Sequence, residues 1–397
     1  MKIVRHHLPC TGLDAMNAYD ITIAGAGPAG SVLALLAARA RYRVLLVERS
    51  QFDRPRFGET APPELRQALT RVGLERLAQA PFCREAPEVL SVWGSDEPWS
   101  RHHIFSPYGT ALHLDRRAFD EALAFAARDA GADLRVGCAA RFAPQPRGGY
   151  IVQLSTGERT RTNVAILATG RAGGGLGLPY VRQYLDNNVA VAARFSPPAG
   201  HLETRTVIEA VLGGWFYLAV LPGTEIIAVF ITLATLVPSG HRARLRWWLE
   251  ALAQTTVVRK ALNGCRLPET LLVANARASF ARSGAGDRWF AIGDARIAPD
   301  PLSGQGIIWA IDDAVSALEF LRRMESCDLA QDLQAKTARE VEVYRFERSR
   351  VYSSEQRFND DAFWSVSRGM HFLPQSVRLR RKSIGEVEGA EFDGFSR

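Results

Sequence analysis

The sequence predicts an α/β protein with a parallel-sheet domain, an inserted α+β region and a helical C-terminal tail. Three observations predict this fold. Residues 20–50 read as strand, glycine-rich turn, helix and second strand, a second glycine-rich segment follows a short strand near residue 290, and residues 183–274 alternate in the manner of a sheet. The 397 residues, 47% of them hydrophobic, allow a large core divided into two or three domains.

The first glycine-rich segment reads GAGPAG over residues 25–30, the G-x-G-x-x-G pattern of dinucleotide-binding folds. Gly25 permits a tight turn, Gly27 lets the backbone approach a pyrophosphate, and Gly30 lets the helix pack close to the strand. The free N–H groups at the start of the following helix attract the phosphates. The cofactor contacts that this unit predicts are Gly25, Gly27, Pro28, Ala29, Gly30, Glu48 and Arg49.

An acidic residue ends the second strand of this unit. Glu48 follows the apolar run Val44–Val47 and comes eighteen residues after Gly30. At this position a carboxylate accepts hydrogen bonds from the ribose hydroxyls of an adenosine. The strand–helix–strand context makes the motif specific, but this half of the site does not distinguish FAD from NAD.

The second glycine-rich segment, FAIGDARIAPDPLSGQGIIWA, covers residues 290–310. Asp294 follows the end of a strand, where it can bind a ribitol hydroxyl. Gly304 and Gly306 open a helix over Ile307–Leu321, whose N-terminal N–H groups can face a flavin and stabilise negative charge on its reduced ring. A second dinucleotide-contact site so far along the chain favours FAD. The predicted contacts are Asp294, Pro301, Gly304, Gly306 and Ile307.

This segment resembles the second FAD motif of the para-hydroxybenzoate-hydroxylase-like flavoprotein superfamily. Two further stretches are similar to motifs of that superfamily. LDRRAFDEAL at 114–123 resembles its D-R-x-x-F-D segment, whose arginine, here Arg116, lies near the flavin, and VAILATG at 164–170 resembles the strand and turn before the substrate domain. The resemblance covers roughly residues 18–325.

A third stretch narrows the resemblance. PRFGETAPPEL at 55–65 is similar to the G-E-[ST]-L-x-P element of the flavin-dependent halogenase branch. Its G-E-T-x-P-P variant, followed by an S-x-W-G element at 91–94, is closer to the flavoprotein monooxygenases of tryptophylquinone biogenesis. Those enzymes act in the maturation of quinohemoprotein amine dehydrogenase and of lysine or glycine oxidases.

The resemblance implies a Rossmann-like FAD-binding domain of the glutathione-reductase type and an inserted α+β substrate domain. The expected divisions are an FAD-binding domain at 18–80, 108–182 and 275–330, a substrate domain at 81–107 and 183–274, and a C-terminal helical region at 331–397. Within the inserted region the pattern predicts strands over Asn188–Phe195, Thr206–Ala210, Trp215–Val220 and Glu225–Thr232, and one amphipathic helix over Arg242–Ala261.

By resemblance the protein is a flavin-dependent monooxygenase. FAD, reduced by external NAD(P)H or a partner reductase, reacts with O2 to give a C4a-hydroperoxide that hydroxylates an aromatic ring. The ring expected here is a tryptophan side chain in a protein or peptide substrate destined to become a tryptophylquinone.

Two alternatives stay open. One is a small-molecule aromatic hydroxylase, halogenase or geranylgeranyl-type reductase on the same fold, and another is a flavoprotein that only binds the precursor. Halogenation is disfavoured because halogenases hold their oxidant with a lysine downstream of G-E-S. This chain has no lysine between Lys2 and Lys260, and arginine does not replace such a point donor.

Candidate catalytic and substrate residues lie in the same motifs. Glu59 is the candidate acid or base, or it orients a flavin loop; the alternative is a capping or salt-bridged glutamate. The expected substrate pocket contains Thr60, His113, Trp215 and Tyr217. For the two aromatic residues the alternative is ordinary sheet core, and for the histidine it is a structural role.

Composition limits the remaining function classes. The net charge is +7 and only four of the 49 basic residues are lysine, which fits an anionic cofactor or an acidic partner. Nucleic acid is not expected as a partner, because the only basic cluster is Arg378–Lys382 in the tail. No membrane span is expected, since Pro222 and Gly223 interrupt the apolar stretch 216–237. The five cysteines lack metal spacing, so we expect reduced thiols, no metal site and a cytoplasmic protein.

Overall fold

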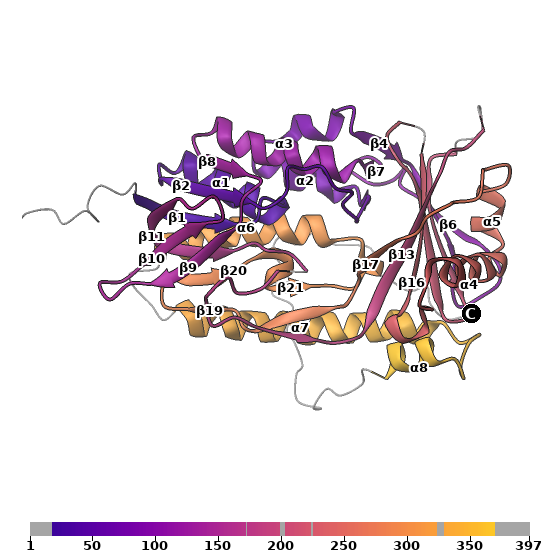
Figure 1. Cartoon of the computed structure of the whole chain (residues 1–397). Helices are drawn as coiled ribbons and strands as arrows, with labels where there is room; N and C mark the ends of the chain where they lie inside the picture. Colours follow the sequence, from indigo (N-terminus) through magenta and orange to yellow (C-terminus); the bar gives the residue numbers. More distant parts are fainter. Residues whose placement is uncertain (1–17, 172, 199–202, 224, 324–328, 370–397) are drawn as a thin grey trace, which may run out of the picture.

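Two large β-sheets organise the molecule, one toward each end of its long axis (Figure 1). The computed structural model describes residues 18–171, 173–198, 203–223, 225–323 and 329–369. A parallel sheet with its helices lies at one end, an antiparallel sheet lies at the other, and the long helix α7 runs beneath both (Figure 1). The predicted α/β class, with a Rossmann-like sheet and a helical C-terminal region, is confirmed.

The first sheet has eight strands, and its main path runs β19-β20-β11-β1-β2-β8. From β20 to β8 every neighbouring pair is parallel, while β9 and β10 extend antiparallel from β11. The bounds are β1 (Ala18–Ala24), β2 (Val44–Glu48), β8 (Asp133–Val136), β9 (Ala140–Pro144), β10 (Tyr150–Leu154), β11 (Arg159–Leu167), β19 (Ala285–Gly286) and β20 (Trp289–Ala291).

Helices cover one face of this sheet, and the β9–β10 hairpin covers the other. The side chains of Ile21 and Ile23 point to the helical face, where they join one apolar cluster with α1, α3 and α6. The neighbouring strand residues Leu45 and Val47 pack on the hairpin side. Because both faces are buried, these strands are continuously apolar, as parallel strands usually are. The helices are α1 (Pro28–Arg39), α2 (Glu64–Arg71), α3 (Arg116–Asp129) and α6 (Gly306–Arg323).

The second sheet has seven strands in the order β17-β13-β16-β15-β14-β5-β6, and all pairs except β14 with β5 are antiparallel. Its four central strands lie where the alternating pattern predicts them, with ends that differ by at most one residue. The bounds are β5 (Glu88–Val92), β6 (Trp99–His102), β13 (Asn188–Phe195), β14 (Arg205–Val211), β15 (Gly214–Val220), β16 (Ile226–Leu233) and β17 (Leu272–Asn275). The division into domains at the expected boundaries stays a prediction.

The single helix expected over Arg242–Ala261 is wrong, because the chain forms α4 (His241–Ala253) and α5 (Val257–Ala261). The break has a partner on the sheet. Glu209, buried on β14, accepts hydrogen bonds from the backbone N–H groups of Thr256, Val257 and Val258. A carboxylate at a helix N-terminus satisfies its free donors and favours a new helix start. The acid lies far away in sequence, so local periodicity did not predict the break.

Two small sheets lie between the large ones. One has the order β3-β7-β4, and the other has the order β12-β18-β21. The bounds are β3 (Thr60–Ala61), β4 (Cys83–Ala86), β7 (Ala111–Leu114), β12 (Val181–Tyr184), β18 (Ser279–Ser283) and β21 (Ile297–Ala298). Short 3-10 turns η1 (Glu75–Gln79), η2 (Ala234–Leu236), η3 (Gly293–Ala295) and η4 (Pro301–Ser303) complete the list.

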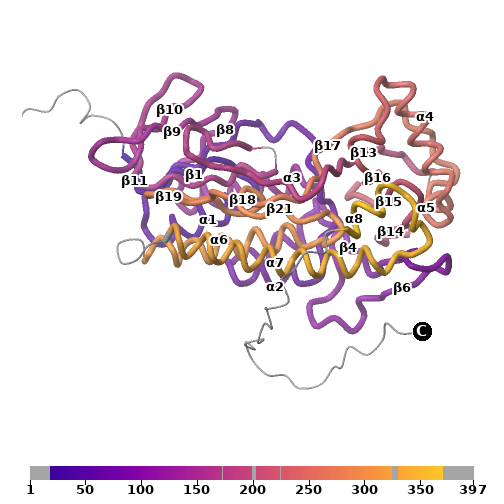
Figure 2. The backbone as a smooth tube through the Cα atoms, turned by 90° about the horizontal axis from the view of Figure 1, so that it is seen from below, coloured from indigo at the N-terminus to yellow at the C-terminus, as the bar shows by residue number. Residues whose placement is uncertain are grey.

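The C-terminal region consists of α7 (Leu329–Ser354) and α8 (Ala362–Arg368). Seen from below, α7 runs beside α6 toward the antiparallel sheet, and α8 lies against that sheet (Figure 2). Among the described residues no helix is both long and apolar enough to cross a membrane. Cys83, Cys138 and Cys265 are free thiols. Cys10, Cys327 and the basic cluster Arg378–Lys382 lie outside the described residues.

Candidate cofactor and substrate site

Four parallel strands end at the same edge of the first sheet. The ends of β1, β2, β11 and β20 are Ala24, Glu48, Leu167 and Ala291, and each strand pairs in register with its neighbour. In open α/β sheets ligands bind beside the carboxyl ends of the strands. The two glycine motifs and Glu48 lie directly after these ends or at the next helix start, so the fold brings them to one edge, whereas Arg116 begins α3 after β7 of a small sheet.

The glycines of the first motif have different surroundings. Gly25 has φ +109°, and a Cβ there would lie 2.2 Å from the carbonyl oxygen of Ala168. A Cβ on Gly30 would lie 1.9 Å from the carbonyl oxygen of Gly25. By contrast, a Cβ on Gly27 would meet no atom within 4 Å. Gly25 and Gly30 are therefore required for packing, whereas Gly27 leaves open space where a phosphate can approach the backbone. Pro28 is the first residue of α1, and Ala29 is buried beside it.

Glu48 is buried and fully engaged. Its Oε2 accepts a hydrogen bond from the backbone N–H of Ala26 (3.0 Å), and its Oε1 accepts from the N–H and Oγ of Ser50 (3.0 and 2.7 Å). Burial opposes ionisation, but the Ser50 bonds and the guanidinium of Arg56, 3.4 Å away, hold the pKa of Glu48 below its usual range. The carboxylate is thus charged and fixed where a ribose hydroxyl could bind. Arg49 is exposed beside it.

The second motif packs directly onto the first. Gly293 has φ +58°, and a Cβ there would lie 2.7 Å from the Cβ of Ala29 on α1. Its N–H donates to the carboxylate of Asp313 on α6 (2.7 Å). Asp294 comes next in the 3-10 turn η3, so it lies beside the first turn of α1. The fold therefore brings together the two motifs, which lie more than 260 residues apart.

Arg171 is a site residue that sequence analysis missed. Its Nε forms an ion pair with Asp294 (3.1 Å), and its Nη2 donates to the carbonyl of Pro299 (2.6 Å). It directly follows the VAILATG stretch, which was the available signal. The last residue of that stretch, Gly170, has φ +67° and open space at the Cβ position. Arg171 thus fixes Asp294 and the start of the following loop.

Residues 299–306, named the cofactor loop here, connect β21 to α6. Pro301 begins the 3-10 turn η4, and Gly304 ends it with φ +61°. Cβ atoms on Gly304 and Gly306 would meet nothing within 4 Å, while Ile307 is buried in the first turn of α6. Together with Gly27, these open positions form a backbone-lined edge that fits an extended dinucleotide such as FAD. The individual cofactor contacts stay predictions.

Arg116 binds the neighbouring G-E-T element. Its Nη1 donates to the carbonyls of Phe57 (2.7 Å) and Gly58 (3.2 Å), and its Nε donates to Asp120 (3.1 Å). Burial opposes its charge, but Asp120 outweighs burial and raises the pKa of the guanidinium. The charges of Glu59 and Asp294 act in the same direction, which places Arg116 near both motifs. Its Nη1 thus binds the G-E-T element, while its Nε and Nη2 bind Asp120 on the same helix.

Glu59 is buried with one carboxylate oxygen unpaired. Its Oε2 accepts a hydrogen bond from the N–H of Gly58 (2.9 Å), whereas Oε1 has no partner among the described residues. Burial raises the pKa of Glu59, although the Gly58 bond and the charges of Arg116 and Arg194 oppose that shift. A carboxyl group in such a position can hold a proton closer to neutral pH than an exposed glutamate can.

Thr60 and Tyr217 join the G-E-T element to the seven-stranded sheet. The two hydroxyl groups lie 2.6 Å apart in a hydrogen bond. Burial and the nearby charge of Glu59 raise the pKa of Tyr217 well above its usual value, so the phenol is neutral. The structure therefore brings together three of the predicted substrate-site residues, Glu59, Thr60 and Tyr217. They lie where the small β3-β7-β4 sheet meets the seven-stranded sheet.

His113 does not line an open site, which corrects the expectation that it belongs to the substrate pocket. Its Nδ1 lies 2.9 Å from the carbonyl oxygen of Val220, and its Nε2 lies 2.9 Å from Oγ1 of Thr206. The side chain is completely buried, and burial lowers the pKa of His113 to about 4. Both ring nitrogens are occupied, so this neutral histidine bridges β7 to the seven-stranded sheet.

Trp215 is likewise covered rather than exposed to a pocket. Only 2% of its surface is accessible, and its indole N–H donates to the hydroxyl of Tyr352 (3.0 Å) on α7. The rings of Trp93 and Trp215 meet edge to face at 6.4 Å, and Trp93 also contacts Trp364 at 5.1 Å. Trp215 lies on the same face of the sheet as Tyr217, but the C-terminal helices cover it. The sequence gives no indication of this covering.

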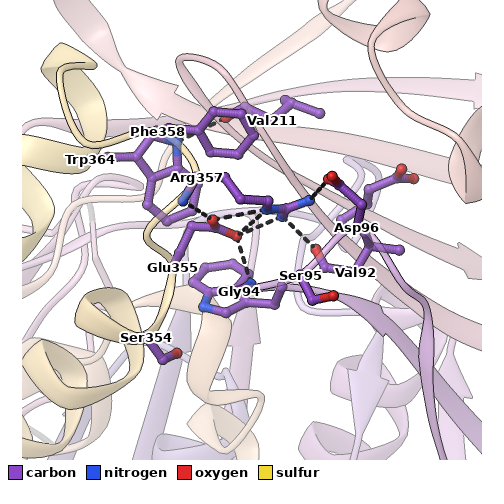
Figure 3. Close-up of polar contacts among 12 residues, drawn as sticks. Val92, Gly94, Ser95, Asp96, Val211, Ser354, Glu355, Arg357, Phe358 and Trp364 are labelled. Atoms are coloured by element: carbon purple, nitrogen blue, oxygen red, sulfur yellow. Dashed lines mark hydrogen bonds and ion pairs between the residues drawn. The ribbon is translucent and has the colours of Figure 1, made fainter. Parts of the chain in front are cut away.

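The tail is also tied to the turn between β5 and β6 (Figure 3). The carboxylate of Glu355 accepts hydrogen bonds from the N–H of Gly94 (2.7 Å) and from Nη2 of Arg357 (2.6 Å), and Arg357 continues to Asp96 (2.7 Å) (Figure 3). A Cβ on Gly94 would lie 2.8 Å from the carbonyl of Ser354. The S-x-W-G element therefore packs against the C-terminal region, a role that sequence analysis did not predict.

A cavity of about 710 Å³ lies between α6 and α7. Its wall includes Asp294 and Gly306, and Trp309, Val343 and Tyr352 contribute apolar surface. The cavity thus shares the cofactor loop with the candidate site. Among the described residues no cluster of three or more His, Cys, Asp or Glu side chains could hold a metal ion.

The sequence is similar to several flavoproteins. It is 28% identical over 358 residues to LodB of Marinomonas mediterranea, described as an FAD-dependent oxidoreductase, an alignment that covers 88% of this chain and 96% of LodB. It is also 28% identical over 329 residues to a menaquinone reductase of Mycobacterium tuberculosis, covering 79% of this chain and 78% of that protein. No protein-family model matches the sequence.

Solved structures share the fold. The myxobacterial chondrochloren halogenase CndH superposes with a TM-score of 0.75 at 21% identity, covering 88% of this chain and 86% of CndH. The peptidyl tryptophan dihydroxylase QhpG, essential for tryptophylquinone cofactor biogenesis, superposes with a TM-score of 0.72 at 21% identity, covering 89% of this chain and 79% of QhpG. At such low sequence identity the superpositions show a shared fold and do not assign a reaction or a substrate.

Proposed function

We propose that this chain, an enzyme of the halogenase-like branch of the flavin-dependent monooxygenases, binds FAD and hydroxylates a tryptophan side chain in a protein or peptide. The reaction would be a step in tryptophylquinone biogenesis. The observation that carries the proposal is the shared strand edge, where both glycine motifs leave open backbone at Gly27, Gly304 and Gly306. The similarity to LodB, an FAD-dependent oxidoreductase, supports the cofactor, and the choice of substrate is motivated by the fold shared with the peptidyl tryptophan dihydroxylase QhpG.

The FAD-holding residues divide by chemistry. The N-terminus of α1 at Gly27 would receive the pyrophosphate, and Glu48 would receive the adenosine ribose. Asp294, held by Arg171, would bind the ribityl chain, and the cofactor loop would lie against the flavin ring. Bound FAD, reduced by NAD(P)H or a partner reductase, supplies the activation of O2 that hydroxylation needs.

The chain's own contribution is a dry and fixed environment. Glu59 would hold a proton near the ring, because burial raises its pKa and its Oε1 is unpaired. Thr60 and Tyr217 would fix the G-E-T element against the sheet through their 2.6 Å hydrogen bond. Arg116 would keep the same element in place through the carbonyls of Phe57 and Gly58.

Cofactor binding is tested with a matched glycine pair. Gly27→Val places a side chain into open space, so we expect a folded protein that has lost FAD. Gly25→Ala forces a Cβ against the carbonyl of Ala168, so we expect it to lose folding stability as well. Flavin content and the denaturation midpoint distinguish the two outcomes. A Gly27→Val protein that binds FAD as tightly as the wild type contradicts the proposed site.

The reaction is tested by supplying the reduced enzyme with isotopically labelled dioxygen and a precursor polypeptide, beside free tryptophan and in the presence of bromide. Label in the indole of the polypeptide alone supports the proposal. Label only in free tryptophan favours a small-molecule hydroxylase, and bromine in the product favours a halogenase. The missing lysine between residues 2 and 260 argues against bromination.

A further inference from the structure

A buried polar network joins the cofactor loop to α7. The backbone N–H of Asp300 donates to the hydroxyl of Tyr344 (2.7 Å), and its Oδ1 accepts from the N–H of Leu302 (2.9 Å). Its Oδ2 accepts from Nε of Arg348 (3.1 Å) and from the hydroxyl of Tyr352 (3.0 Å). Three side chains of α7 therefore contact one loop residue, and that residue is 2% exposed.

The other end of Arg348 binds a different segment. Its Nη2 forms an ion pair with Asp186 (3.1 Å), in the connection between β12 and β13. Asp186 also accepts hydrogen bonds from the N–H groups of Asn188 and Ala278 (3.1 Å each). One guanidinium thus spans the cofactor loop and the point where the chain enters the seven-stranded sheet. The planar fork of arginine suits this bridge, whereas lysine offers a single point of contact.

Tyr352 connects the same loop to the sheet itself. Its hydroxyl accepts from the indole N–H of Trp215 (3.0 Å) and donates to Asp300. Trp215, Asp300, Arg348 and Tyr352 are all at least nine-tenths buried. Buried networks of this kind hold their geometry strictly, because any lost partner leaves a desolvated polar group.

We propose that Arg348 and Tyr352 are positioning residues, through which the C-terminal helix sets the cofactor loop at a fixed place relative to the substrate sheet. This inference rests on the proposed function. The loop carries the open Gly304 and Gly306, so its placement would determine both how well FAD is held and how far the ring lies from the substrate. A loop that populates the competent arrangement less often weakens apparent cofactor affinity by the same fraction.

The experiment uses Tyr352→Phe, which removes one hydroxyl and keeps the ring. We expect its FAD dissociation constant, from fluorescence titration of the apoprotein, to rise about fivefold to tenfold. Arg348→Lys keeps the charge but cannot bridge both acids, so we expect a rise of at least roughly tenfold. In both variants the midpoint potential of bound flavin should fall, because the loop N–H groups stabilise the reduced ring less.

Tyr19→Phe is the matched control, since it removes another tyrosine–carboxylate hydrogen bond, to Asp133 on the remote edge of the first sheet. We expect it to lower thermal stability but to leave FAD affinity and potential unchanged. Wild-type flavin affinity and potential in both Tyr352→Phe and Arg348→Lys overturn the inference. A wild-type enzyme that binds FAD but oxygenates no indole contradicts only the proposed reaction, because flavin affinity and potential still report on the loop.

Discussion

Phe216 and Tyr217 are neighbours in β15, yet they lie on opposite faces of the seven-stranded sheet. Phe216 packs on the outer face, where its ring stacks on Phe230 at 4.6 Å and meets Trp248 of α4 edge to face. Tyr217 lies on the inner face, toward the first sheet, and bonds to Thr60. The outer face is mainly an apolar core, in which Glu209 binds the start of α5, whereas the polar atoms of the inner face bind the G-E-T element and α7.

The difference between the two faces separates residues that contribute to folding stability from residues that also contact the candidate site. On the outer face, the indole N–H of Trp248 on α4 donates to the backbone carbonyl of Val191 in the sheet beneath it (2.9 Å). On the inner face, Trp215 and Tyr217 donate to or accept from side chains of α7 and of the G-E-T element. A change on the outer face should therefore alter folding alone, while a change on the inner face should also alter cofactor or substrate binding.

The largest expected effect tests the outer face. Trp248→Ala empties a fully buried position and removes its bond to Val191, so we expect the free energy of unfolding to fall by about 3–5 kcal/mol. Urea denaturation measures the loss. FAD affinity of the folded fraction should stay within about twofold of wild type, and a larger change would show that the outer face reaches the site.

The next largest effect is the pH dependence of folding stability, which tests His113 at the inner face. The folded-state pKa of His113, about 4, lies below the value of 6.5 for an exposed histidine, so the unfolded chain binds more protons. Stability is therefore fully present above about pH 6.5 and is lost as the pH falls toward 4. From this group alone we expect a loss of about 3 kcal/mol.

The comparison protein for this measurement is His113→Gln, which cannot titrate. Denaturation curves of both proteins between pH 8 and 4 isolate the histidine, since the other groups are common to both. The wild type should lose more stability than the variant on acidification. Parallel curves for the two proteins contradict a neutral bridging histidine.

The contrast also explains what the sequence could predict. Alternation in GGWFYLAVLPG assigns Trp215 and Tyr217 to one face and Phe216 to the other, because side chains alternate along a strand. The motif GAGPAG likewise predicts its own turn, because the conformation of a turn depends on residues that are close in sequence. The covering of Trp215 by Tyr352 depends on contacts 137 residues apart, which no local pattern encodes.

The second motif shows the same limit. Asp294 and the open glycines of the cofactor loop were predicted, because a strand end and a helix start mark them. Arg171 and Arg348 were missed, because an arginine in a chain with 45 of them carries no signal until the fold supplies its carboxylate partner. Glu209, which divides α4 from α5, was missed because its partners, the backbone N–H groups of α5, lie far away in sequence.

The smallest expected effect tests the contact that joins the inner face to the G-E-T element. Tyr217→Phe and Thr60→Val each remove one side of the same 2.6 Å hydrogen bond, so each should lower the free energy of unfolding by about 1 kcal/mol. The double variant should lose little more than either single one, because the two hydroxyl groups serve one bond. Denaturation of the four proteins gives this coupling.

The same four proteins report on function, since Glu59 lies between Gly58 and Thr60. If the bond holds Glu59 in place, kcat should fall in both single variants while KM for the polypeptide changes little. Phe216→Leu, the neighbouring change on the outer face, should leave kcat unaltered. Equal losses of kcat in Phe216→Leu and Tyr217→Phe would remove the distinction between the two faces, because both substitutions would then act only through general loosening of the sheet.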